Sequence, residues 1–191
     1  RLNRHSPNYP NLPCGNMPAY HSKVDESSFP TACGCSLLPL RTNVRGPAPP
    51  HDSTDNDVID ETIAFFRANV LFKNFDVQGG ADRTLIYLTL YLQSCMAACE
   101  KVTDKKEAKT VLYQHAIKAF VCPGDTGWGL GGMFPSAANR EESDAFKAYF
   151  KQARTELSER ALETLYTADG SQNKWWMCFV KRKFMGKELR T

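Results

Sequence analysis

Cysteine and histidine side chains near the N-terminus are the residues whose types could bind a metal. Cys33 and Cys35 flank a single glycine, and Cys14 and His21 precede them. Structural zinc sites normally hold cysteines in pairs with wider spacing than one residue, and this chain has no matching second pair. We therefore expect no metal site.

Residues 124–132 form a glycine-rich segment that could present backbone N–H groups to a phosphate. The segment lacks the terminal Gly-Lys-Ser/Thr of a P-loop, and no strand-like run precedes it. Phe134 also stands where a dinucleotide fingerprint starting at Gly129 requires glycine. We expect a flexible turn that Trp128 holds in place, and no cofactor.

Catalytic side chains are no better indicated. Asp57, Asp60 and Glu61 crowd the start of a predicted helix, where the helix dipole already explains acidic residues. A catalytic triad needs a nucleophile beside a positioned base, but three of the four histidines precede the predicted helices and His115 lies on one of them. We therefore expect no catalytic residues and a protein that is not an enzyme.

The C-terminal segment 174–187 combines two adjacent tryptophans with many basic side chains, which favours docking over catalysis. Trp176, Phe179 and Val180 share one side of a helix that ends near Arg182, and this geometry turns the tryptophans inward. A charge run is usually a solvated face, but tryptophans and lysines can also stack bases and neutralise phosphates. The candidate partner-binding residues are Lys174, Lys181, Arg182, Lys183 and Lys187.

The elements that must position these residues are predicted to be helices. Hydrophobic periodicity gives an all-α fold, a single helical domain of about five helices, with N-caps at Thr54 or Asp55, Asp104 and Asn139. The predicted helices cover about 55–75, 81–101, 104–122, 139–166 and 174–182. Apolar residues cover several sides of 81–101, so we expect one central helix enclosed by the others, with Cys95 and Cys99 as buried small hydrophobes.

Residues 17–53 form an extended N-terminal arm rich in proline, with room for short strand pairing. Leu37, Leu38 and Leu40 are its expected contacts with the helices. Residues 1–16 lack an apolar anchor, so we expect a disordered extension preceding a single domain at 17–191.

Composition limits the class of protein. With 191 residues and 42% apolar residues, the chain has the size of one domain with a real core. The net charge is +3, but without Arg1 and Arg4 only 22 basic residues face 21 acidic ones, which argues against a globally cationic nucleic-acid binder. Residues 1–16 contain no secretory signal, so we expect a cytoplasmic location with the cysteines as thiols. The longest apolar stretch, 85–92, is too short to span a bilayer, so we expect no membrane insertion.

Several motifs along residues 17–189 closely resemble subunit 3 of the actin-related protein 2/3 complex. They are Met17–Ser22 (MPAYHS), Leu37–Leu40 (LLPL), Gly46–Pro49 (GPAP), Asp57–Glu61 (DVIDE), Phe65–Val70 (FFRANV), Phe72–Phe75 (FKNF), Ala81–Tyr87 (ADRTLIY) and Lys174–Trp176 (KWW). A collinear series of this length is far more specific than any single short pattern. The loop departs from the family, since Trp128 and Gly129 follow Gly127 where Phe-Pro is usual.

The resemblance implies an all-helical, non-catalytic structural subunit of a seven-subunit assembly that starts a new actin filament as a branch on an existing one. It also implies packing beside actin-related protein 3, location in the cytoplasm and cytoskeleton, and no cofactor, nucleic acid or membrane partner. Contact of Lys181, Arg182 and Lys183 with acidic surfaces of the actin filament is an inference from charge. The alternative is a stand-alone basic-aromatic nucleic-acid-binding module.

Deleting residues 1–16 is expected to leave folding and assembly unchanged, because these residues offer no apolar contact to the core. Thermal melts of the full and shortened chains test this expectation. A fall in melting temperature of several degrees would assign a structural role to the segment.

Overall fold

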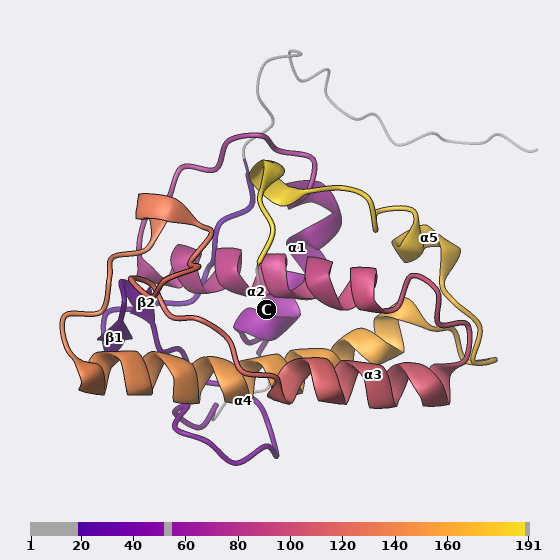
Figure 1. Cartoon of the computed structure of the whole chain (residues 1–191), viewed down its shortest axis with the longest axis horizontal. Helices are drawn as coiled ribbons and strands as arrows, with labels where there is room; N and C mark the ends of the chain where they lie inside the picture. The colour runs from indigo at the N-terminus through magenta and orange to yellow at the C-terminus, as the bar shows by residue number, and fades with distance from the viewer. Residues whose placement is uncertain (1–18, 52–54, 190–191) are drawn as a thin grey trace, which may run out of the picture.

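The computed structural model describes residues 19–51 and 55–189, so the expectation about residues 1–16 lies outside the described residues. The described part is mostly helical, as predicted, with one small antiparallel hairpin (Figure 1). In chain order the elements are β1 (Thr31–Ala32), β2 (Cys35–Ser36), α1 (Val58–Asn69), α2 (Gly80–Ala98), α3 (Lys105–Ile117), η1 (Gly131–Met133), α4 (Arg140–Leu165), α5 (Lys174–Met177) and η2 (Phe184–Gly186), where η marks a 3-10 helix.

Helix α2 crosses the middle of Figure 1, with α3 and α4 along one side and α1 crossing it. It contacts α1, α3, α4, β2 and η2, and 14 of its 19 residues are buried. Leu88 and Cys95 have no exposed surface, and Cys99, just after the helix, has none either. The two cysteines are therefore buried small hydrophobes, as predicted.

The predicted N-caps of α3 and α4 are confirmed. The Asp104 carboxylate accepts the backbone N–H groups of Lys106 and Glu107, and the Asn139 side chain accepts that of Glu142. These side chains satisfy amide groups that have no partner within the first helical turn. Helix α3 nevertheless ends at Ile117, several residues before the predicted end near 122.

Helix α1 is shorter at both ends than the predicted 55–75. Asp57, and not Thr54 or Asp55, is its N-cap, in a reciprocal capping box with Asp60. At the other end, the Asn69 side chain exchanges two hydrogen bonds of 2.9 Å with the backbone of Tyr20 in the arm. The arm thus takes part in defining where this helix stops.

The arm lies on the helices through apolar contacts and hydrogen bonds. Leu37, Leu38 and Leu40 are buried, as predicted. The Tyr149 hydroxyl of α4 donates to the Leu38 carbonyl at 3.0 Å, and the Thr84 hydroxyl of α2 donates to the Ser36 carbonyl at 2.7 Å. These contacts join residues far apart in sequence, so the arm is held on both α2 and α4.

The hairpin turns at Cys33 and Gly34, which both have left-handed backbone angles, with φ of 50° and 71°. A Cβ atom on Gly34 would lie 2.7 Å from Cδ of Pro135, so this position requires glycine for space as well as for conformation.

Arg160 of α4 ties the arm to the start of α1. Its guanidinium donates to both carboxylate oxygens of Asp57, at 2.7 and 2.8 Å, and to Asp60 at 2.8 Å. It also donates to Glu156 at 2.7 Å and to the Arg41 carbonyl. The Asp57 side chain is fully buried and that of Arg160 is 16% exposed, so these charges compensate one another away from solvent.

A second cation, Arg154, is fully buried without a carboxylate partner among the described residues. Its guanidinium lies 4.4 Å from the ring centres of both Tyr91 and Phe120 and donates to the His115 carbonyl at 3.1 Å. The two aromatic faces therefore supply part of the electrostatic compensation that an acid would otherwise give.

Candidate partner-binding surface

The basic residues predicted for partner binding lie along one C-terminal segment. Lys174 belongs to α5, Lys181, Arg182 and Lys183 follow it, and Lys187 comes just after η2. The side chains of the first four are exposed, whereas Lys187 is half-buried. The structure thus brings four of the five candidates to the surface.

Two anchors hold this segment on the helices. The Asn173 side chain caps α5 by accepting the N–H group of Trp175 at 3.1 Å. Further along, Phe184 is buried, and its N–H group donates to Oε1 of Gln93 at 2.8 Å. Nε2 of Gln93 donates to the Lys187 carbonyl at 3.2 Å, so one α2 side chain holds both sides of η2.

The charge of the segment is only partly neutralised. Lys183 pairs with Glu188 at 2.7 Å, and both side chains are more than half exposed. Lys174, Lys181 and Arg182 form no ion pair with any residue of the described ranges 19–51 and 55–189. Their charge therefore projects into solvent, where it is screened by salt but can attract an acidic surface.

A groove of about 570 Å³ lies between α2 and this basic segment. Ala97, His115 and Val180 line it together with Lys181 and Arg182. Burial lowers the pKa of His115 to about 4, and the positive charges of Arg154 and Lys118 act in the same direction. His115 is consequently neutral near pH 7, so the positive charge at this groove comes from lysine and arginine.

The predicted helix through Arg182 is wrong in extent, because α5 ends at Met177 and turns follow. The prediction that both tryptophans face inward is also wrong. Trp176 is half-buried, with its ring 5.8 Å from that of Phe66 and 5.5 Å from the Arg67 guanidinium, whereas Trp175 is 79% exposed. Adjacent helical residues point about 100° apart, so a single core-facing side cannot take both rings.

The residues considered for a metal are used otherwise. His21 contacts Asp82, with Nδ1 and Oδ2 2.7 Å apart, and Cys33 and Cys35 are buried. Burial raises the pKa values of both thiols, and Cys122, whose sulfur lies 3.6 Å from that of Cys33, raises the latter further. Cys14 lies outside the described residues, among which no cluster of histidine, cysteine and acidic side chains could hold a metal ion.

The ring of Trp128 lies in the glycine-rich loop and packs edge-on against Phe134 and Phe146, at 5.4 and 6.3 Å between ring centres. This is the holding role predicted for Trp128.

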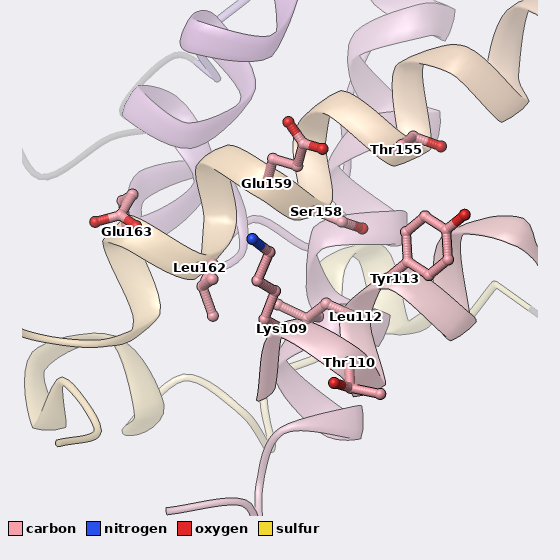
Figure 2. A pocket seen from close by; sticks show the side chains of 9 residues that line it. All are labelled: Lys109, Thr110, Leu112, Tyr113, Thr155, Ser158, Glu159, Leu162 and Glu163. Carbon is pink, nitrogen blue, oxygen red and sulfur yellow. The ribbon is translucent and has the colours of Figure 1, made fainter. Parts of the chain in front are cut away.

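A second hollow, of about 480 Å³, lies between α3 and α4, and Figure 2 shows its lining. Lys109 lines it together with the acidic Glu159 and Glu163, and the Ser158 hydroxyl lies 2.8 Å from that of Tyr91. This hollow mixes opposite charges, so its lining does not prefer a ligand of either sign.

The exposed side chains of Trp175 and Arg67 were not predicted from the sequence. Trp175 could have been found from its position next to a core-facing tryptophan on one helix. Arg67 carries no comparable signal, because its position over Trp176 joins residues of α1 and α5 that are distant in sequence.

Within the described ranges, no helix has both the length and the hydropathy needed to cross a bilayer.

Comparison with known proteins agrees with the motifs in the chain. The family described as "P21-Arc: ARP2/3 complex ARPC3 (21 kDa) subunit" matches residues 17–189. The chain is similar to Actin-related protein 2/3 complex subunit 3 of Arabidopsis thaliana, with 42% identity over 167 residues that cover 87% of this chain and 96% of the relative. The proteins of the same name from Dictyostelium discoideum and Schizosaccharomyces pombe are 42% and 39% identical, over 89% and 91% of this chain and 99% and 100% of the relatives. The chain therefore belongs to the family of the 21 kDa subunit of the ARP2/3 complex.

Proposed function

We propose that this chain is a non-catalytic structural subunit of the ARP2/3 complex and supports the nucleation of branched actin filaments. The observation that carries the proposal is the family match over residues 17–189, together with relatives named as subunits of that complex. The match favours this role over a stand-alone nucleic-acid-binding module. The chain then acts in the cytoplasm, at the actin cytoskeleton, packed beside actin-related protein 3.

The packing of α2 suits such a structural role. We interpret α2 as a central helix enclosed by the others, because most of its residues are buried and it contacts α1, α3, α4 and the hairpin. A helix packed on several sides resists local unfolding, since separating it from any neighbour exposes apolar surface. The outer helices and the C-terminal segment are thereby held in a fixed relation to one another, which is what a scaffold requires.

Lys181, Arg182 and Lys183 are proposed as the contact with the actin filament. Lys181 and Arg182 are exposed and lack an acidic partner among the described residues. Lys183 and Lys187 extend the same positive segment, although an ion pair with Glu188 partly neutralises Lys183. Rim charges of this kind raise the rate of association and set its orientation, provided that the partner surface is acidic.

Reversing Lys181 and Arg182 to glutamate is expected to lower branch density on pre-formed filaments about fivefold or more, because attraction to an acidic surface becomes repulsion. The measurement uses the reconstituted complex, with thermal melts of the isolated subunit. Raised salt should produce a milder form of the same defect in the wild-type complex.

The matched control reverses Lys106 and Lys109, two exposed lysines of α3, to glutamate. This control changes the net charge by the same amount on a different surface, and branch density should stay near the wild-type value. Wild-type branching by the Lys181 and Arg182 variant would contradict the proposed contact. These residues would then be solvent-exposed charges without a partner.

A further inference from the structure

Trp175 is the most exposed large hydrophobic side chain of the described residues, at 79%. Leaving an indole in water forgoes the free energy that its burial would release. Tryptophan is also one of the residue types enriched among the few side chains that dominate binding energy at protein interfaces. Its position is therefore better explained by a partner than by the packing of this chain alone.

The backbone around Trp175 is fixed before any partner arrives. The Asn173 side chain accepts a hydrogen bond from the N–H group of Trp175. The Asn173 backbone carbonyl accepts one from the N–H group of Met177 at 2.9 Å. The next residue, Trp176, contacts both the Phe66 ring and the Arg67 guanidinium of α1. Binding through Trp175 would thus require little further ordering of the main chain, which lowers the entropic cost of association.

The charges beside the ring define the partner. Lys174 is exposed next to Trp175, and exposed Arg67 covers the neighbouring indole of Trp176. A complementary surface combines an apolar pocket for the ring with carboxylates at its rim. We name the set of Arg67, Lys174 and Trp175 the tryptophan surface.

Two occupants from this protein itself are disfavoured by charge. Residues 1–18 contain two arginines and no aspartate or glutamate, so they carry no charge complementary to Lys174 and Arg67. A second copy of the chain would bring its own Lys174 and Arg67 to a symmetric contact, where like charges repel. The occupant is consequently a different protein chain.

We propose that the tryptophan surface anchors this chain to a neighbouring subunit of its complex, whose apolar pocket, rimmed by carboxylates, receives the Trp175 ring. The inference rests on the proposed function as a complex subunit and adds the residue that carries the attachment. It separates two surfaces of the C-terminal segment, since Trp175 serves assembly while Lys181 and Arg182 meet the filament.

The test compares Trp175→Ala with Tyr113→Ala in the reconstituted complex. Tyr113 is an exposed aromatic residue of α3, so its removal deletes a similar side chain from another surface. Retention of the tagged subunit by the other subunits is measured by titration, alongside melts of the isolated subunit. Trp175→Ala should weaken retention about thirtyfold without changing the melt, and Tyr113→Ala should retain the wild-type affinity.

Charge reversal supplies a second reading of the same surface. The double variant Arg67→Glu, Lys174→Glu should be retained less well than the wild type. The loss should be larger at low salt than at high salt, because salt screens the repulsion between the new glutamates and the carboxylates of the partner. Wild-type retention of Trp175→Ala would overturn the inference. Normal assembly of this variant with defective branching would also overturn it, because the ring would then face the filament. Failure of the wild-type chain itself to assemble would instead overturn the proposed function.

Discussion

Replacing Arg160 by alanine is expected to lower the free energy of unfolding by about 3–5 kcal/mol, because the substitution leaves the buried Asp57 carboxylate without its cation. The loss extends beyond one ion pair. Arg160 also holds Asp60 and the Arg41 carbonyl, so the start of α1 and the arm lose their shared contact with α4. Urea unfolding followed by circular dichroism measures this loss.

The control for this prediction is Arg140→Ala at the other end of the same helix. Arg140 lies 3.7 Å from Asp144 in an exposed i,i+4 pair, and such pairs contribute little in water. A cost below about 0.5 kcal/mol is expected there. Equal costs at the two arginines would show that burial of the Asp57 network contributes nothing.

Acid should remove the same stabilisation in the wild-type protein. Burial by itself would raise the pKa of Asp57, but hydrogen bonds from Arg160 and from the N–H groups of Asp60 and Arg41 outweigh it and lower the pKa below the ordinary value of 3.8. The folded state therefore binds this proton less readily than the unfolded chain does. The contribution is fully present above about pH 4 and disappears as the pH falls through the lowered pKa.

Arg160→Ala removes the cause of that lowered pKa. Its stability should consequently fall less steeply than that of the wild type as the pH drops below about 4. Parallel slopes for the two proteins over this range would show that other carboxylates account for the acid sensitivity.

The second large effect is expected at Leu88 in the middle of α2. Leu88→Ala should cost about 2–5 kcal/mol, because the side chain is fully buried and its removal leaves a cavity that neighbouring helices fill only in part. Leu71→Ala is the matched control, since Leu71 is 56% exposed and the same atoms are deleted. Its expected cost is below about 0.5 kcal/mol.

Chemical denaturation of both leucine variants provides the comparison. A cost at Leu88 no larger than that at Leu71 would remove the basis for regarding α2 as enclosed. A large cost would link the hydrophobic stripe seen in the sequence to the stability of the whole domain.

Features that depend on near neighbours in the chain could be predicted from the amino-acid sequence. The extents of α2 and α4 follow from apolar periodicity over many residues, and the starts of α3 and α4 follow from Asp104 and Asn139, whose side chains bind amides two or three residues away. Family membership was evident for the same reason, because its motifs are short and lie in order along the chain.

Features that depend on residues distant in sequence are visible only in the folded chain. Helix α1 stops where Asn69 meets Tyr20, and Arg160 reaches Asp57 across 103 residues of sequence. Of the two adjacent tryptophans, Trp176 packs against Phe66 of α1 and Trp175 is exposed. The ends of helices and the exposed fractions of side chains depend on which surfaces pack together in the folded chain. Local sequence patterns do not predict these tertiary contacts.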